Sequence, residues 1–126
     1  MGLLVESVTI DSMDPVSLAS FWCAALDWTS RVDEDGDVWV EPGPGHPDAD
    51  RVRPLLFIAV PEPKSGKNRI HFDLVADDQE QEVERLEALG ATRPSIGQSG
   101  TESWVVLADP EGNEFCVLAE AAPTGT

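Results

Sequence analysis

Residues Asn68–Asp78 read NRIHFDLVADD, and residues Glu6–Asp14 read ESVTIDSMD. Apolar and polar side chains alternate in both stretches, which predicts a strand, and each stretch ends on an aspartate that suits a helix N-cap. Ser7 of the earlier stretch aligns with His71 of the later one, and Asp14 aligns with Asp78. The chain therefore starts the same strand-and-helix pattern twice, which indicates an internal repeat of a supersecondary unit.

The first half of the chain predicts a strand, a helix and three further strands. The helix starts at Asp14-Pro15, a cap followed by proline at the first helical position, and runs to about Leu26. The strands are expected over 4–11, 28–32, 38–41 and 55–60. Residues 33–37 (DEDGD) suggest a calcium loop, but no glutamate follows at the required spacing, so a hairpin turn is the better prediction. A loop of about a dozen residues, longer than the usual connection, begins at 42–47 (PGPGHP).

The second half predicts the same order again. A strand over 69–75 leads into a helix that is capped by Asp77 or Asp78 and ends at Leu89, before Gly90. Three more strands are expected over 91–96, 104–108 and 114–119. The fold class is thus predicted to be α+β, with two βαβββ modules in a single domain over residues 1–120. Its parts are module one (about 3–60), a linker (61–68), module two (about 69–120) and a flexible tail (121–126).

Composition excludes several classes of partner. The chain has 126 residues, a formal net charge of −16 and a pI of about 4.1. Such a charge is repelled by nucleic acid and by anionic lipid surfaces. The sequence contains no apolar run of the roughly 20 residues that span a bilayer, and its first residues do not resemble a signal peptide. The two cysteines do not make a disulfide framework, so a reducing cytoplasm is the expected location.

Several motifs in order resemble one protein family. They are ALDW at 25–28, PEPK at 61–64, HFDL at 71–74, WVVLADP at 104–110 and DPEGNEFCVL at 109–118. This set is similar to the vicinal oxygen chelate superfamily, which includes glyoxalase I, bleomycin-resistance proteins and extradiol dioxygenases, and most of all to its glyoxalase-like subgroup. The resemblance covers about residues 3–120. It is specific for the fold and much less so for the chemistry.

The resemblance implies a curled mixed sheet in which the two modules enclose a central cavity, and a homodimer. It also implies a divalent metal on the cavity floor in the members that are enzymes. The corresponding ligand positions here are Ser7, His71 and Cys116, with a fourth somewhere in 55–60, a stretch that contains no Asp, Glu or His. Only His71 has the usual ligand type, so a degenerate metal site and no firm cofactor are expected.

A metal remains an alternative. His71 and Cys116 could hold a soft ion such as Zn²⁺ if a third protein ligand joined them. Asp73 or Glu114 could supply it only if the strands bring these side chains close. His71 and Cys116 could instead form an activated thiolate pair, or Cys116 could be a small apolar residue of a core strand.

Strand alternation predicts which side chains face the cavity. The expected pocket residues are Ser7, Trp39, His71, Asp73, Trp104, Glu114 and Cys116. Trp39 and Trp104 lie on matching strands, where they could form aromatic walls for a flat or apolar ligand, or equally plug the cavity or pack at an interface. Among the five basic residues between 51 and 69, Arg69 is expected to matter most, and Arg51 and Lys64 are expected to be solvated.

Two functions follow from these expectations. The first is a cytoplasmic protein that binds a small, aromatic or apolar organic molecule without requiring a metal. The alternative is a metal-dependent lyase, isomerase or dioxygenase of the same superfamily. The catalytic residues are unknown in either case.

Overall fold

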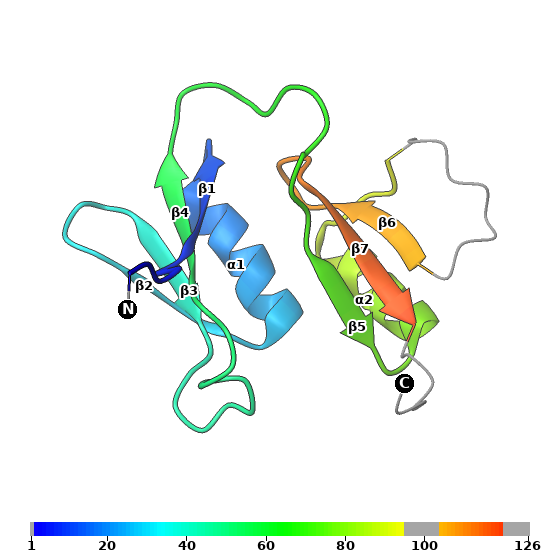
Figure 1. Ribbon diagram of the computed structural model, residues 1–126. Helices are drawn as coiled ribbons and strands as arrows, with labels where there is room; N and C mark the ends of the chain where they lie inside the picture. The colour runs from blue at the N-terminus through cyan, green and yellow to red at the C-terminus, as the bar shows by residue number, and fades with distance from the viewer. Residues whose placement is uncertain (1, 95–103, 120–126) are drawn as a thin grey trace. The chain divides into compact units, whose positions relative to one another are not determined.

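The computed structural model describes residues 2–94 and 104–119 (Figure 1). The chain forms two compact units, Met1–Pro63 and Lys64–Thr126, called unit one and unit two below. The boundary falls inside the predicted linker 61–68, and each unit contains one of the two repeated patterns.

Unit one has one helix and a four-stranded sheet. Its elements are β1 (Val8–Ser12), α1 (Pro15–Leu26), β2 (Thr29–Val32), β3 (Val38–Glu41) and β4 (Leu55–Ala59). The strand order is β1-β4-β3-β2, with β1 parallel to β4 and the other pairs antiparallel. Asp14 caps α1 by accepting a hydrogen bond from the Ser17 backbone N–H, as its position before Pro15 predicts. The helix packs mainly on β3 and β4.

Unit two repeats this arrangement with three strands among its described residues. Its elements are β5 (Asp73–Ala76), α2 (Gln79–Leu89), β6 (Trp104–Ala108) and β7 (Glu114–Ala119). The order is β5-β7-β6, with β5 parallel to β7 and β6 antiparallel to β7. Val83 and Leu86 are the buried side chains of α2, which packs on β5 and β7. In both units the first strand is therefore the parallel neighbour of the last, and the predicted α+β class is confirmed.

The two repeated strands begin later than predicted. β1 begins at Val8 rather than residue 4, because its partner β4 begins only after Pro54, whose carbonyl accepts from the Val8 N–H. β5 begins at Asp73 rather than residue 69, and Ile70, expected on the buried face, is 81% exposed. A strand needs a partner for its backbone groups, and an apolar alternation alone does not supply one.

The strand expected over 91–96 is not formed by the part of it that the structure describes. Residues 91–94 contain only a single bridge between Thr92 and Ala108, and residues 95–96 lie outside the described ranges, as does the predicted tail 121–126. No helix within the described ranges is long and apolar enough to span a bilayer.

Core packing yields a stability prediction for unit two. Leu107 on β6 is fully buried, so Leu107→Ala should lower the free energy of unfolding by about 2–5 kcal/mol. Val75→Ala, at a strand position that is 66% exposed, should change it by less than about 1 kcal/mol. Urea unfolding followed by circular dichroism measures both. If both variants lowered the free energy of unfolding equally, Leu107 would not be a core residue of unit two.

Candidate functional site

One face of the unit-two sheet is hollowed. Phe115 and Val117 on β7 are buried, whereas Cys116 and Leu118, whose side chains alternate with them, are only partly covered. The hollow has a volume of about 340 Å³. It is lined by Lys67, His71, Asp73, Trp104, Val106, Glu114, Phe115, Cys116 and Leu118. Five of these nine residues were predicted to face a cavity, and all nine belong to unit two.

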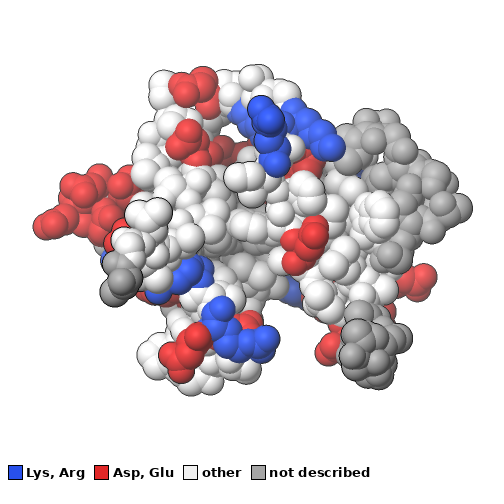
Figure 2. Space-filling model, viewed as in Figure 1, with Lys and Arg blue, Asp and Glu red and all other residues white. Residues whose placement is uncertain are grey.

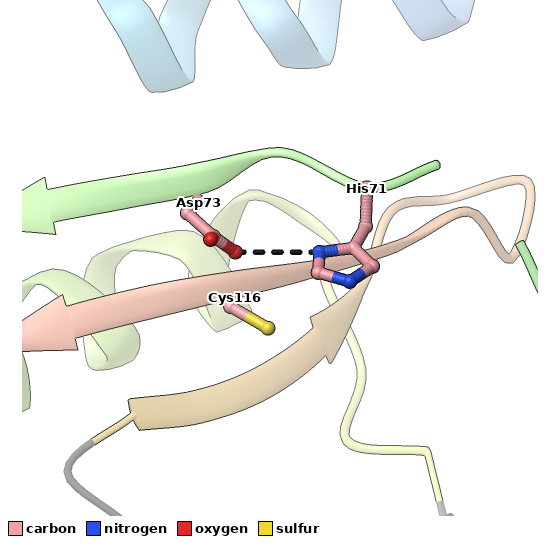
Figure 3. A group of neighbouring side chains, drawn as sticks. All are labelled: His71, Asp73 and Cys116. Atoms are coloured by element: carbon pink, nitrogen blue, oxygen red, sulfur yellow. Dashed lines mark ion pairs between the residues drawn. The ribbon is translucent and has the colours of Figure 1, made fainter. Parts of the chain in front are cut away.

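The polar corner of the hollow is made by His71, Asp73 and Cys116. The β5–β7 register sets Asp73 directly opposite Cys116, and His71 lies two residues before Asp73 on the segment that leads into β5. His71 Nδ1 lies 3.3 Å from Asp73 Oδ1. Figure 3 shows the three side chains converging from the two neighbouring segments, and one potential ligand atom of each lies within 4.8 Å of the others. The structure thus brings Asp73 close, which the sequence left open.

The surroundings of Cys116 favour its thiol over its thiolate. Burial raises the pKa of the Cys116 thiol, and the negative charge of Asp73 and a hydrogen bond with Asp73 raise it further, while Lys67 opposes the shift. An activated thiolate needs a net cationic setting. The geometry therefore gives no support to the nucleophile hypothesis. Cys116 is instead a hydrogen-bonding partner of Asp73.

Glu114 lines the hollow, but both of its carboxylate oxygens are engaged. Oε2 lies 3.1 Å from the Lys64 ammonium, and Oε1 accepts a 2.8 Å hydrogen bond from the Asn68 backbone N–H. The Asn68 side-chain amide also donates to the Glu114 backbone carbonyl at 3.4 Å. These contacts, called the Glu114 latch below, fasten residues 64–68 to the start of β7. Lys64, expected to be solvated, is therefore largely covered, with 20% of its side chain exposed.

The Glu114 latch controls the ionisation of its carboxylate. Burial alone would raise the pKa of Glu114, but the hydrogen bond from Asn68 and the ammonium of Lys64 outweigh it, so the pKa lies below its ordinary value. A lowered pKa in the folded state means that the ionised carboxylate stabilises the fold.

The predicted residues of unit one make contacts of their own. Trp39 Nε1 donates a 2.8 Å hydrogen bond to Asp33, and the Arg31 guanidinium lies 5.0 Å from the Trp39 ring centroid. Ser7 Oγ lies 3.5 Å from the Thr9 hydroxyl. Trp39 is thus tied to the β2–β3 hairpin.

The aspartate-rich turn at 33–37 is a hairpin, as predicted. Asp33, Asp35 and Asp37 offer oxygens within 4.8 Å of one another. However, Asp33 Oδ1 accepts from the backbone N–H groups of Asp35 and Asp37, and its other oxygen accepts from Trp39. The hydrogen bonds to Asp33 lower its pKa, that from Trp39 most of all. Asp33 therefore organises the turn.

Four residues of the lining were not among those predicted from the sequence, namely Lys67, Val106, Phe115 and Leu118. Val106 and Leu118 could have been found from alternation, because they lie two residues from Trp104 and Cys116 respectively. Lys67 had no such signal, because it lies outside any strand and is placed by the Glu114 latch. Arg69 is exposed and does not line the hollow.

The residues of the polar corner fit some metals better than others. Imidazole, carboxylate and thiolate together suit a borderline-soft ion such as Zn²⁺, whereas Mg²⁺ and Mn²⁺ prefer an all-oxygen or oxygen and imidazole set. The protein ligands would be His71, Asp73 and Cys116. The sequence left the third ligand open between Asp73 and Glu114, and the structure brings Asp73 to this position.

Comparisons with known proteins agree with the fold. A family model described as a glyoxalase-like domain matches residues 7–118. Among solved structures, a glyoxalase/bleomycin resistance protein/dioxygenase family enzyme from Burkholderia phytofirmans PsJN is 19% identical, with a TM-score of 0.67 over 92% of this chain and 98% of that one. A mutant of the fosfomycin resistance protein FosX from Listeria monocytogenes, complexed with Mn(II) and 1S,2S-dihydroxypropylphosphonic acid, is 12% identical, with a TM-score of 0.68 over 96% and 93%. The comparison with curated proteins found no match.

The lowered pKa of Glu114 predicts a pH-dependent contribution to stability. At neutral pH, Glu114→Gln should lower the free energy of unfolding by about 1.5–3 kcal/mol, because a charged hydrogen-bond acceptor is lost. This difference should shrink as the pH falls below the ordinary carboxyl range and through the lower folded pKa, since wild-type Glu114 is then protonated too.

Urea unfolding of both proteins along a descending pH series measures this effect. Glu84→Gln, on the exposed face of α2, is the matched control and should not show it. A difference between wild type and Glu114→Gln that stays constant with pH would show that the charge of Glu114 is not what stabilises the latch.

Proposed function

Because the chain belongs to the glyoxalase-like domain family, we propose that it binds a small, aromatic or apolar organic molecule at the hollow of unit two. The observation that carries the proposal is an apolar wall next to a polar corner. Trp104, Val106 and Leu118 supply the wall, and the His71–Asp73–Cys116 group supplies the corner. Ligand pockets in proteins are mostly apolar with a few convergent polar groups.

Size and exposure support this proposal. A volume of about 340 Å³ lies at the lower end of the usual range for small-molecule sites, about 300–1,000 Å³. Trp104 is 42% exposed, so part of its indole is available for stacking. Exposure of a large aromatic side chain beside a hollow costs solvation free energy, which a stacked ligand would recover.

The rest of the proposal comes from the family resemblance and the composition. The protein acts as a homodimer in the cytoplasm, and its net charge of −16 keeps it from nucleic acid and anionic membranes.

Removal of the Trp104 indole tests the binding proposal. The neutral planar probe 2-naphthamide should bind wild-type protein, and Trp104→Leu should bind it roughly tenfold more weakly, because stacking and its buried area are lost. Equilibrium dialysis measures both affinities without relying on tryptophan fluorescence.

Val16→Leu is the control for this experiment, because Val16 is exposed on α1 of unit one. It should bind the probe as wild type does. Equal affinities of wild type and Trp104→Leu would rule out the indole as a wall of the binding site.

A second candidate function is a metal-dependent lyase, isomerase or dioxygenase. It is favoured by the three convergent donors, His71, Asp73 and Cys116. A bound metal would act as a Lewis acid that polarises oxygen atoms of the substrate. In this function His71, Asp73 and Cys116 would hold the ion, and the apolar wall would exclude water from the bound substrate.

Elemental analysis of protein purified without chelator tests this second function. It predicts stoichiometric metal in wild type and its loss in His71→Ala, because an imidazole ligand is removed. His46→Ala, which removes the other histidine of the chain, should retain the metal. If the wild-type protein contains no metal and still binds the aromatic probe, the metal-dependent function is contradicted and the binding function is supported.

A further inference from the structure

We infer that the ligand is an organic anion whose carboxylate group pairs with Lys67 while its apolar or aromatic body lies against Trp104 and Leu118. The inference rests on the proposed binding function and names the chemical class of the ligand.

Lys67 is held at the hollow by its neighbours in the chain. The Glu114 latch anchors Lys64 on one side and Asn68 on the other, and the Lys64 ammonium also donates to the Gly66 carbonyl. Gly66 has a φ of +77°, a conformation that suits glycine and lets the segment turn between the two anchors. The backbone on both sides of Lys67 is therefore anchored, and Lys67 is one of the residues that line the hollow.

The Lys67 ammonium is also available to pair with a ligand. Within the ranges that the structure describes, it takes part in no ion pair or hydrogen bond, although its charge acts on Cys116. Most other basic side chains have acidic partners, namely Arg31 with Glu41, Arg51 with Asp48, Lys64 with Glu114, Arg85 with Glu82 and Arg93 with Glu87. Lys67 is therefore the cation that the hollow offers to an incoming group.

Each carboxylate of the hollow has a partner other than Lys67. Glu114 pairs with Lys64, which lies outside the lining, and Asp73 is engaged by His71 and Cys116. Lys67 is the one ammonium among the lining residues, in a chain whose formal net charge is −16. Acidic and basic side chains both lie on the face shown in Figure 2, and one of its basic groups lies over the segment after β4, which contains Lys64, Lys67 and Arg69. Such a local group of cations attracts an anion.

The arrangement also specifies the kind of anion. A small inorganic anion would leave the apolar wall of Trp104, Val106 and Leu118 uncovered, and a neutral aromatic molecule would leave Lys67 unpaired. A planar carboxylate satisfies both, because a charge-assisted hydrogen bond to the ammonium is compatible with stacking on the indole.

A matched pair of probes tests the inference. We expect wild-type protein to bind 2-naphthoate at least fivefold more tightly than 2-naphthamide, which has the same ring system without the charge, when equilibrium dialysis is done at low salt. Added salt should reduce this preference, because a partly exposed charge pair is screened. Lys67→Gln should remove the preference by weakening naphthoate binding alone, and Lys67→Arg should keep it.

Arg69→Gln is the control variant. It changes the net charge by the same amount as Lys67→Gln, at a residue two positions later in the chain. Arg69 is exposed and does not line the hollow, so the preference for naphthoate should remain. If both probes bind wild type equally, or if Lys67→Gln keeps the preference, the inference is wrong and the binding function stands. If neither probe binds, both are wrong.

Discussion

The parallel pairing of the first strand with the last in each unit is the constraint on which the rest of the structure depends. In unit two it joins β5 to β7, and the register sets Asp73 opposite Cys116. Parallel neighbours need a long crossover, which α2 and β6 supply, and the helix covers one face of the sheet. Only the opposite face of the sheet is then available for a site. The hollow therefore lies on that face because β5 pairs with β7 and α2 covers the other side.

The same pairing explains why acidic groups at the hollow are tolerated. β5 begins at Asp73, the Phe72 carbonyl before it still accepts from the Cys116 N–H of β7, and residues 64–68 are fastened to Glu114 at the start of β7. That contact neutralises Glu114 and leaves Lys67 at the rim of the hollow. The chain contains two lysines. Lys64 stabilises the structure through Glu114, and Lys67 is exposed to solvent.

Asp73 has a similar double role. It accepts from Cys116 and lies next to His71, so that two side chains from different segments share one carboxylate. Without a metal this group is a closed polar corner that can orient a ligand. With a soft metal the same three side chains would be its protein ligands. The apolar wall serves either function, which is why the fold alone does not choose between them.

The sequence by itself determined the α+β class, the repeat and the bounds of most elements. These elements have local signals in the sequence that tertiary contacts did not override. The signals are strand alternation and the helix N-caps at Asp14 and Asp78. His71, Glu114 and Cys116, which alternation predicts to share one face, all line one hollow in the structure. Only the tertiary structure decided where β1 and β5 begin, which acid joins His71 and Cys116, and which lysine reaches the hollow. Those outcomes depend on register and on contacts between residues far apart in the chain, such as Lys64 and Glu114, which a local pattern of side chains does not encode.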